Sequence, residues 1–263
     1  MSDHELDEPV VPTPQAADPE VVQADQDDLT DALGGLSQVA LGAQPLEESL
    51  ARIGALAVLA IPGADGAGVT MLEAGHGKTV AASDPFVRAV DDIQYGLGEG
   101  PCVTAVAEHR TIVSGVLGED RSWPRFGPRV RSLGVNSALS LPLVLADDTL
   151  GALNVYARDR DVFTDQAARL GETFAVAAAV AVHNVRILMQ AQRLAGQLQA
   201  ALTNRATIDQ AIGIICARQG FTATEAFARL RTISQGENVK LHVVAQNIVN
   251  EAIRRARARH AES

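Results

Sequence analysis

The pattern of apolar and polar residues divides the chain near Pro45. Before it, the only recurring apolar positions lie in the stretch LTDALGGLSQVAL, and Pro, Asp, Glu and Gln dominate the rest. Such a composition buries too little apolar surface to offset the entropy lost when a chain becomes ordered. We therefore predict a disordered acidic tail over residues 1–44, which leaves room for a short helix after Asp31.

From Pro45 to about residue 163, helical and strand-like segments alternate. Apolar residues recur at helical spacing in LEESLARIGALAVLAI, and DPFVRAVDDIQY and CVTAVAEH are shorter helical segments. Two hairpins are predicted, one from AGVTMLEA and GKTVAAS, the other from SALSLPLVL and LGALNVYAR. With TIVSGV as a further strand, this order predicts an α+β domain on a mainly antiparallel sheet with flanking helices.

A single long helix is predicted after this domain. The last proline is Pro142, and no strong helix breaker follows Thr164 until Gly220. Thr164 is a suitable N-cap, and Asp165 lies at the positive end of the helix dipole. A helix over residues 165–219 is roughly 80 Å long at 1.5 Å per residue. That length favours a coiled coil or a connector between domains.

Alternate steps of four and three residues from Ile187 trace one seam along this helix. Eight of its nine positions are apolar, and Arg205 is the exception. Such spacing keeps one stripe facing a partner helix, which predicts a parallel homodimer. The alternative is that the helix lies on the core of its own domain. The seam consists of Ile187, Ala191, Leu194, Leu198, Ala201, Arg205, Ile208, Ile212 and Ile215.

Two shorter helices follow Gly220. Thr222 and Glu225 have the spacing of a capping box. Apolar residues then recur at helical spacing and place Phe227 among the expected core residues, with Ala226 and Leu230. A third helix is predicted from about Val239. Together with the tip of the long helix, these segments predict a small three-helix module.

Charge is distributed unevenly along the chain. Residues 1–31 contain ten Asp or Glu and no Lys or Arg, whereas residues 200–263 contain five acidic and nine basic residues. The acidity is thus largely a property of the tail, and the last part of the chain is basic enough to accept an anionic partner. The longest apolar run has nine residues, FAVAAAVAV, whereas a membrane span needs about 20. We expect a cytoplasmic protein without a membrane partner.

The stretch RATIDQAIGIICARQGFTATEAFARLRTISQGENVKLHVVAQNIV, residues 205–249, resembles an ANTAR domain, the RNA-binding module of bacterial transcription antiterminators. Residues that match the family pattern include Gly213, Ser234 and the pair Ala226-Phe227. Where the family usually has a lysine before the glycine, this chain has Ile212. The resemblance implies that RNA is contacted by Arg205, Arg218, Arg231, Ser234 and Lys240.

Gly213 and Phe227 bear on how that module would bind RNA. We expect Gly213 to permit close approach of the other two helices, with approach of an RNA backbone as the alternative. Because Phe227 is expected in the core and Phe221 is the only other aromatic residue of the module, stacking of bases on protein rings is not expected to dominate binding.

The preceding stretch resembles a GAF domain of the kind paired with ANTAR in bacterial regulators. The resemblance rests on YGLGEGPC, DRSWPRF, GVNSALSLPL and LGALNVYA, and it implies a sensory domain with a small-molecule pocket. Candidate pocket residues are Tyr95, Cys102, Trp123 and Phe126, with the alternative that Trp123 and Phe126 cover the sheet. The Asn-Lys-Phe signature of cyclic-nucleotide GAF domains is missing, and neither resemblance specifies a cofactor.

Cysteine and histidine usage gives little sign of other chemistry. Cys102 is either a reactive thiol beside a helix N-terminus or a small buried residue. Neither Cys102 and Cys216 nor His109 and His183 have metal-ligand spacing. No pair of a nucleophile and a base is recognisable, so we expect neither a metal site nor an enzyme.

The expected organisation is a disordered tail (1–44), a GAF sensor domain (45–185), a coiled-coil linker helix (186–203), an ANTAR domain (204–256) and a basic tail (257–263). It predicts a dimeric regulator that binds paired RNA hairpins in a leader transcript and promotes antitermination under control of a GAF ligand. The alternative is a dimeric signalling or scaffold protein whose helical module contacts only proteins, which Ile212 in place of lysine supports.

Overall fold

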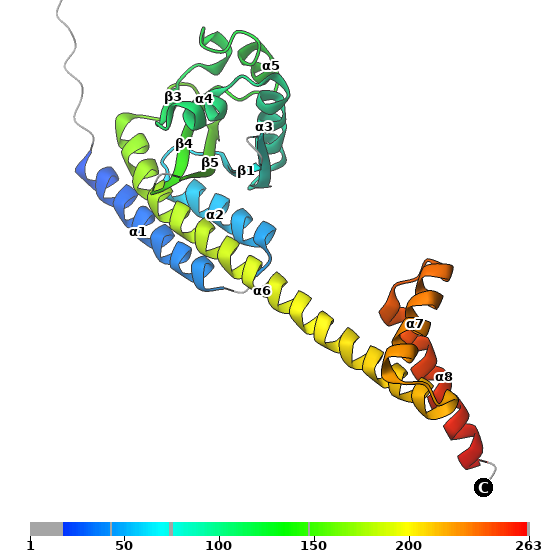
Figure 1. Cartoon of the computed structure of the whole chain (residues 1–263). Helices are drawn as coiled ribbons and strands as arrows, with labels where there is room; N and C mark the ends of the chain where they lie inside the picture. The colour runs from blue at the N-terminus through cyan, green and yellow to red at the C-terminus, as the bar shows by residue number, and fades with distance from the viewer. Residues whose placement is uncertain (1–17, 43, 74–75, 147, 262–263) are drawn as a thin grey trace, which may run out of the picture. The chain divides into compact units, whose positions relative to one another are not determined.

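The computed structural model describes residues 18–42, 44–73, 76–146 and 148–261 (Figure 1). The chain divides into two compact units, Met1–Met189 and Gln190–Ser263. Helix α6 (Asp165–Gln219) contributes residues to both units, and each unit is described separately below.

The first unit is built on a five-stranded sheet whose strands pair in the order β2-β1-β5-β4-β3. Every pairing is antiparallel, so the predicted α+β fold on an antiparallel sheet is confirmed. Both predicted hairpins are present, as β1 with β2 and as β4 with β5. The strands are β1 (Gly66–Glu73), β2 (His76–Ala82), β3 (Ile112–Ser114), β4 (Ser137–Leu145) and β5 (Asp148–Ala157).

Helix α2 (Leu46–Ala60) and the first part of α6 cover one face of this sheet, and α1 (Pro19–Leu41) packs on these helices from outside (Figure 1). Side chains alternate along the strands, so Leu139 on β4 and Leu153 on β5 face these helices. On α6, alanines interleave with Phe174 in the same cluster, which allows close packing of the helix on the sheet. This face is the larger apolar core of the unit.

The other face is covered by α3 (Pro85–Leu97), α4 (Pro101–Glu108) and α5 (Gly127–Arg131), with the short 3₁₀ helix η1 (Leu117–Glu119). Asp84 caps α3 by accepting a hydrogen bond from the Phe86 N–H at 3.0 Å. Pro101 lies in the first turn of α4, as predicted. A second, smaller apolar cluster fills the space between these helices and the sheet.

The prediction of a disordered tail over residues 1–44 is wrong for residues 19–41, which form α1. Asp18 accepts a hydrogen bond from the Glu20 N–H at 3.1 Å, and Pro19 occupies the first turn. The helix is ordered because elements far along the chain supply the apolar surface that its own sequence lacks. Residues 1–17 lie outside the described residues. The buried side chains of α1 are Leu29, Ala32, Leu36 and Val39.

The second unit contains the last part of α6, α7 (Ala223–Glu237) and α8 (Leu241–Ala261). The predicted long helix over residues 165–219 is confirmed. The capping box is confirmed as well, since Thr222 and Glu225 bond to each other's backbone N–H. Helix α8 continues to Ala261, so the separate basic tail predicted over residues 257–263 is instead the end of a helix as far as the described residues go. The core consists of Ala211, Ile215, Ala226, Leu230, Val244, Ala245 and Val249.

Two expectations about the interior of this module are wrong. A Cβ atom built on Gly213 would meet nothing within 4 Å, so Gly213 does not mark a close approach of the other two helices. Phe227 is 42% exposed and does not belong to the core, because Ala226 and Leu230 already occupy the buried side of α7.

Within the part of the chain that the structure describes, α6 is the one helix long and apolar enough to cross a membrane by length and composition. Core helices pass the same test, and Phe174, Ala178 and Val182 of α6 are buried against the sheet. The composition of α6 is therefore weak evidence for a membrane span.

The docking of α1 gives a first prediction. Leu36→Ala should lower the free energy of unfolding of the first unit by about 2–5 kcal/mol, since it leaves a cavity at a side chain that is 2% exposed. The fluorescence of Trp123, the only tryptophan, reports on this unit during urea unfolding.

Leu41→Ala on the same helix is the matched control, because Leu41 is 87% exposed and its truncation should change the free energy by less than about 0.5 kcal/mol. Equal unfolding midpoints for the two variants would contradict the docking of α1.

Candidate functional site

Buried polar side chains lie on the sheet face beneath α3 and α4. At their centre is the carboxylate of Asp91 on α3, which is fully buried. Its Oδ1 accepts hydrogen bonds from the Tyr156 hydroxyl at 2.6 Å, the Gln94 amide at 2.8 Å and the Asn154 amide at 3.1 Å. A buried carboxylate is tolerated only with such donors, so these bonds hold α3 on β5 in one register.

Gln94 connects this cluster to the start of α4. Its amide nitrogen donates to Asp91 and Tyr156, and its Oε1 accepts a hydrogen bond from the Cys102 N–H at 3.0 Å. Gly100 precedes α4 with φ of 152°, and a Cβ there would lie 2.6 Å from the Gln94 side chain. Glycine is required at this position because Gln94 occupies the space that a side chain would need.

A cavity of about 210 Å³ lies beside this cluster, between β1 and helices α3 and α4. At its polar end, the Tyr95 hydroxyl is hydrogen-bonded to the Thr70 hydroxyl and lies 3.3 Å from Cys102 Sγ. Mainly apolar walls with a few polar groups are typical of ligand pockets, although such pockets usually measure roughly 300–1,000 Å³. This cavity is the candidate ligand pocket and suits a small ligand. Its apolar walls are Leu72, Val103, Val106 and Ala107.

Burial keeps the polar end of this pocket uncharged. It raises the pKa of Cys102 to about 12, and the charge of Asp91 adds to the rise. Burial and Asp91 also raise the pKa values of Tyr95 and Tyr156 well above their usual range. The thiolate is the nucleophilic form of cysteine, so Cys102 is protonated and unreactive at neutral pH. Of the two alternatives for Cys102, the structure therefore supports the buried residue.

The four predicted pocket residues separate into two pairs. Tyr95 and Cys102 line the cavity, whereas Trp123 and Phe126 do not. Trp123 Nε1 donates to Thr104 Oγ1 at 3.0 Å, and Trp123 and Phe126 are both buried in the second apolar cluster. They do not line this cavity, and the alternative that they cover the sheet describes them, because these rings fill the space between α4, α5 and the sheet.

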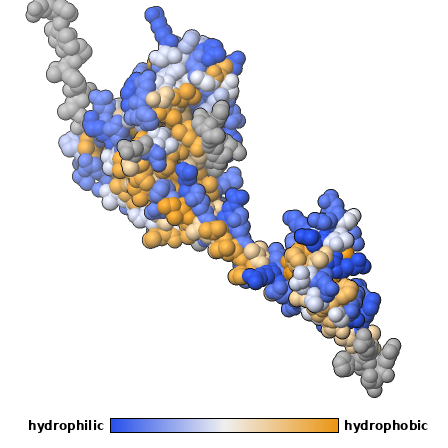
Figure 2. All heavy atoms as spheres, in the orientation of Figure 1, coloured by the Kyte–Doolittle hydropathy of each residue, from blue (hydrophilic) through white to orange (hydrophobic). Residues whose placement is uncertain are grey.

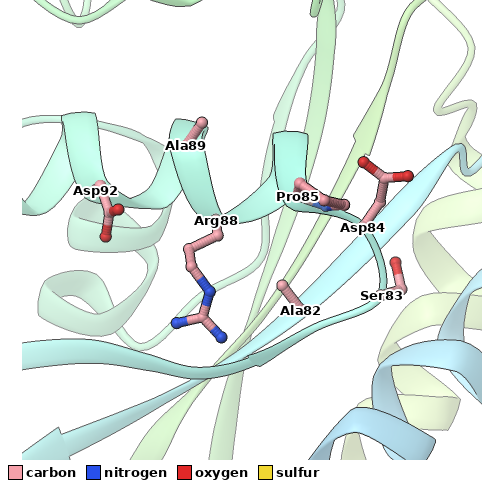
Figure 3. Close-up of a pocket in the computed structure, with 7 residues that line it drawn as sticks. All are labelled: Ala82, Ser83, Asp84, Pro85, Arg88, Ala89 and Asp92. Carbon is pink, nitrogen blue, oxygen red and sulfur yellow. The ribbon is translucent and has the colours of Figure 1, made fainter.

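A second, open groove of about 410 Å³ lies where β2 meets α3. Figure 3 shows the Arg88 side chain extending from α3 toward the strands, with Asp84 at the start of the helix. Asp84, Arg88 and Asp92 are exposed and carry both signs of charge. The cavity beside Cys102 is the better candidate, because it is less open than this groove and its walls shield a ligand better from water.

In the second unit, the predicted RNA-contacting residues lie in different environments. Arg231 and Lys240 are exposed, and neither forms an ion pair within the described residues. Arg205 is also exposed and lies 3.9 Å from Asp209. Arg218 lines a groove that it shares with two glutamates. Ser234 donates its hydroxyl to the Val239 carbonyl at 2.6 Å, so it stabilises the turn between α7 and α8.

The predicted seam on α6 also changes environment along the helix. Ile187, Leu194 and Leu198 are 51–58% exposed, and Ala201 is exposed as well. Ile215 is buried in the core of the three-helix module, where Ile208 and Ile212 pack against it. Ile208 and Ile212 are only half-buried, so among these three isoleucines Ile215 alone is enclosed by its own chain. Leu202, which is 64% exposed, follows Leu194 and Leu198 at steps of four, and the three leucines form an exposed apolar strip. Figure 2 shows apolar atoms at the surface of α6.

Family comparisons match both parts of the chain. A model of the GAF domain matches residues 43–183, which is more than half of the chain, and a model of the ANTAR domain matches residues 196–249.

The chain is a GAF domain protein that also carries an ANTAR domain.

Solved structures similar to this chain cover its GAF part. The GAF domain of a phosphoenolpyruvate-protein phosphotransferase from Coxiella burnetii is 18% identical, with a TM-score of 0.47 over 61% of this chain and 96% of that one. The free methionine-R-sulfoxide reductase of Neisseria meningitidis, solved with its substrate, is 16% identical, with a TM-score of 0.48 over 65% and 95%. A GAF sensor protein from Burkholderia vietnamiensis is 17% identical, with a TM-score of 0.47 over 62% and 98%. A search of curated proteins finds no match.

The GAF domain contains functional candidates that sequence reasoning missed, namely Thr70, Asp91, Gln94 and Asn154. Helical spacing could have found two of them, since Asp91 and Gln94 follow Val87 and Val90 on the buried side of α3. An asparagine inside the apolar strand GALNVYA was a similar signal for Asn154. No group of three or more His, Cys, Asp or Glu is placed to hold a metal among the described residues.

The raised pKa of Cys102 predicts a pH dependence of stability. In the unfolded GAF domain the thiol loses its proton near pH 9, whereas in the folded domain it keeps the proton until about pH 12. Between these values the unfolded state binds fewer protons, so the free energy of unfolding should fall as pH rises, by at most roughly 1.4 kcal/mol per pH unit for this group. Tyr95 and Tyr156 act in the same direction above their ordinary pKa near 10.

Cys102→Ala removes the titrating thiol. The slope of the free energy of unfolding against pH should then become shallower by an amount equivalent to at most one bound proton. Urea unfolding followed by Trp123 fluorescence at pH 8, 9 and 10 measures both slopes. If the two proteins lose stability equally over this range, the thiol is not held protonated by the fold.

Proposed function

We propose that this GAF–ANTAR protein is a transcription regulator that binds paired RNA hairpins in a nascent leader transcript and promotes antitermination. The observation that carries the proposal is the ANTAR match over residues 196–249 on a compact helical module that exposes basic side chains. Lys and Arg hold the phosphates of an RNA, and unpaired loop bases supply its sequence specificity. Arg231 and Lys240 are the best-placed cations, because no acidic partner competes for them within the described residues.

The ANTAR module is proposed to act as a dimer. Leu194, Leu198 and Leu202 on α6 form an exposed apolar strip that a second copy of the same helix would cover. Two modules held together present two RNA-binding faces. Once one hairpin is bound, the second binds at a high effective concentration, which raises affinity without new contacts.

The GAF domain is proposed to sense a small, mainly apolar ligand in the cavity beside Tyr95 and Cys102. The neutral hydroxyl groups of Thr70 and Tyr95 and the thiol of Cys102 at the polar end suit a hydrogen-bonding, uncharged group on that ligand. Sensor and regulatory domains without a nucleophile are expected to bind and not to catalyse, and the protonated Cys102 supports this. We propose that the protein acts in the cytoplasm, where the nascent transcripts are synthesised.

Lys240→Ala tests the RNA-binding surface. Affinity for paired hairpins taken from the leader upstream of the gene should fall for all RNA sequences. The slope of log K against log salt should become shallower by about one, because one phosphate contact is lost. Electrophoretic mobility shifts at several salt concentrations measure both quantities.

Arg121→Ala, which removes one exposed positive charge from the GAF domain, is the charge-matched control and should leave affinity and slope unchanged. If wild-type protein gives no shift with the hairpins, the alternative of a scaffold protein is favoured. The surface assignment fails if Arg231→Ala combined with Lys240→Ala binds the hairpins as wild type does.

Leu198→Asp tests the dimer. A charge placed in an apolar helix interface should shift the wild-type dimer toward monomer at micromolar concentration, as measured by light scattering. Leu59→Asp on α2 is the matched control, because Leu59 is 64% exposed, as Leu198 is at 58%, but lies off the seam. A monomeric wild-type protein at this concentration would sink the dimer proposal.

A further inference from the structure

The two aromatic side chains of the ANTAR module are both exposed. Phe221 is 39% and Phe227 is 42% exposed, and no other Phe, Tyr or Trp occurs in residues 190–263. Neither ring belongs to the core of the module, whose buried residues are all Ala, Ile, Leu or Val. Phe227 therefore lies outside the core and leaves part of its ring available to a partner.

Phe227 shares one side of α7 with Arg231. The two residues are four apart, which puts their side chains next to each other on the helix surface. Ser234 lies on the same side and bonds the Val239 carbonyl at 2.6 Å, while the Val239 N–H donates to the Ser234 carbonyl at 3.0 Å. These bonds fix the turn from α7 into α8, in which the exposed Lys240 directly precedes α8. We call Phe227 and Arg231, together with Lys240 of this turn, the ring–cation face.

The charge on this face has one sign. The acidic residues of α7 are Glu225, which bonds Thr222 in the capping box, and Glu237, which lines the groove with Arg218. Neither lies three, four or seven residues from Phe227. On α7 itself, the neighbouring helical positions of Phe227 thus hold a cation, Arg231, and no carboxylate, which suits a partner that is both anionic and aromatic.

We propose that Phe227 is a stacking platform for an unpaired loop base of the RNA, with Arg231 on the adjoining phosphate and Lys240 on a phosphate further along. Unpaired bases stack on Phe rings, and arginine binds phosphate by charge-assisted hydrogen bonds. The inference rests on the proposed RNA-binding function and names how a loop is held. It replaces the expectation, drawn from a buried Phe227, that stacking does not dominate.

The test compares Phe227→Leu with Phe227→Trp in the full-length chain. The probe is the leader hairpin pair with 2-aminopurine substituted at each loop position in turn. Phe227→Leu removes the ring but no charge, so affinity should fall about tenfold, or about 1.4 kcal/mol, while the salt slope stays as in wild type. The quenching of 2-aminopurine fluorescence on binding should disappear at one loop position. Phe227→Trp should retain both affinity and quenching.

Each other outcome is decisive. If Phe227→Leu binds the hairpins and quenches 2-aminopurine as wild type does, Phe227 is not a stacking platform. The proposed RNA-binding function still stands in that case if the mobility shift of the hairpins depends on Arg231 and Lys240. If wild-type protein binds no hairpin, the proposed function and this inference both fall. If light scattering shows that Phe227→Leu dissociates a wild-type dimer, the ring contacts protein and the inference is wrong.

Discussion

The GAF domain depends on one buried carboxylate. Asp91 is fully buried, and its Oδ1 is hydrogen-bonded by side chains from α3 itself and from β5. Removing those donors would leave a desolvated charge, and removing the carboxylate would leave several buried donors without a partner, each at a cost of roughly 1–3 kcal/mol. The cluster therefore fixes α3 over the sheet, and with α3 it fixes Tyr95, Gln94 and the start of α4.

The same cluster influences the protonation of the polar groups that line the pocket. Burial raises the pKa values of Cys102, Tyr95 and Tyr156, and the nearby Asp91 carboxylate raises them further, so deprotonation of these groups is disfavoured. The polar end of the cavity consequently presents neutral hydrogen-bonding groups. Other residues of the motifs YGLGEGPC and DRSWPRF join the two loops outside the pocket. Glu99 of the first motif accepts hydrogen bonds from the backbone N–H groups of Arg125 and Phe126 in the second.

The ANTAR module follows a different design. Its interior uses small and aliphatic side chains, so rings and cations remain on its surface, where they are available to a partner. The ring–cation face requires both the turn that Ser234 stabilises and the absence of acidic residues beside Phe227. The exposed leucines of α6 are a separate feature, because they lie on the helix before the module core begins at Ala211.

The sequence by itself determined the elements whose signals are local. Periodicity and capping residues predicted the helix Asp165–Gln219, the two hairpins and the capping box at Thr222, because each depends on side chains within a few residues.

Tertiary structure decided what depends on distant partners. Helix α1 is ordered because α2 and α6 provide the apolar surface on which it packs. Trp123 and Phe126 are buried because they fill the space between α4, α5 and the sheet. Ile215 has heptad spacing, yet it is buried in the core that α6 forms with α7 and α8. Phe227 has core spacing, yet Ala226 and Leu230 fill the buried side of α7. Periodicity shows that a residue lies on an apolar stripe, but the packing of other elements decides which part of the stripe is buried and by what.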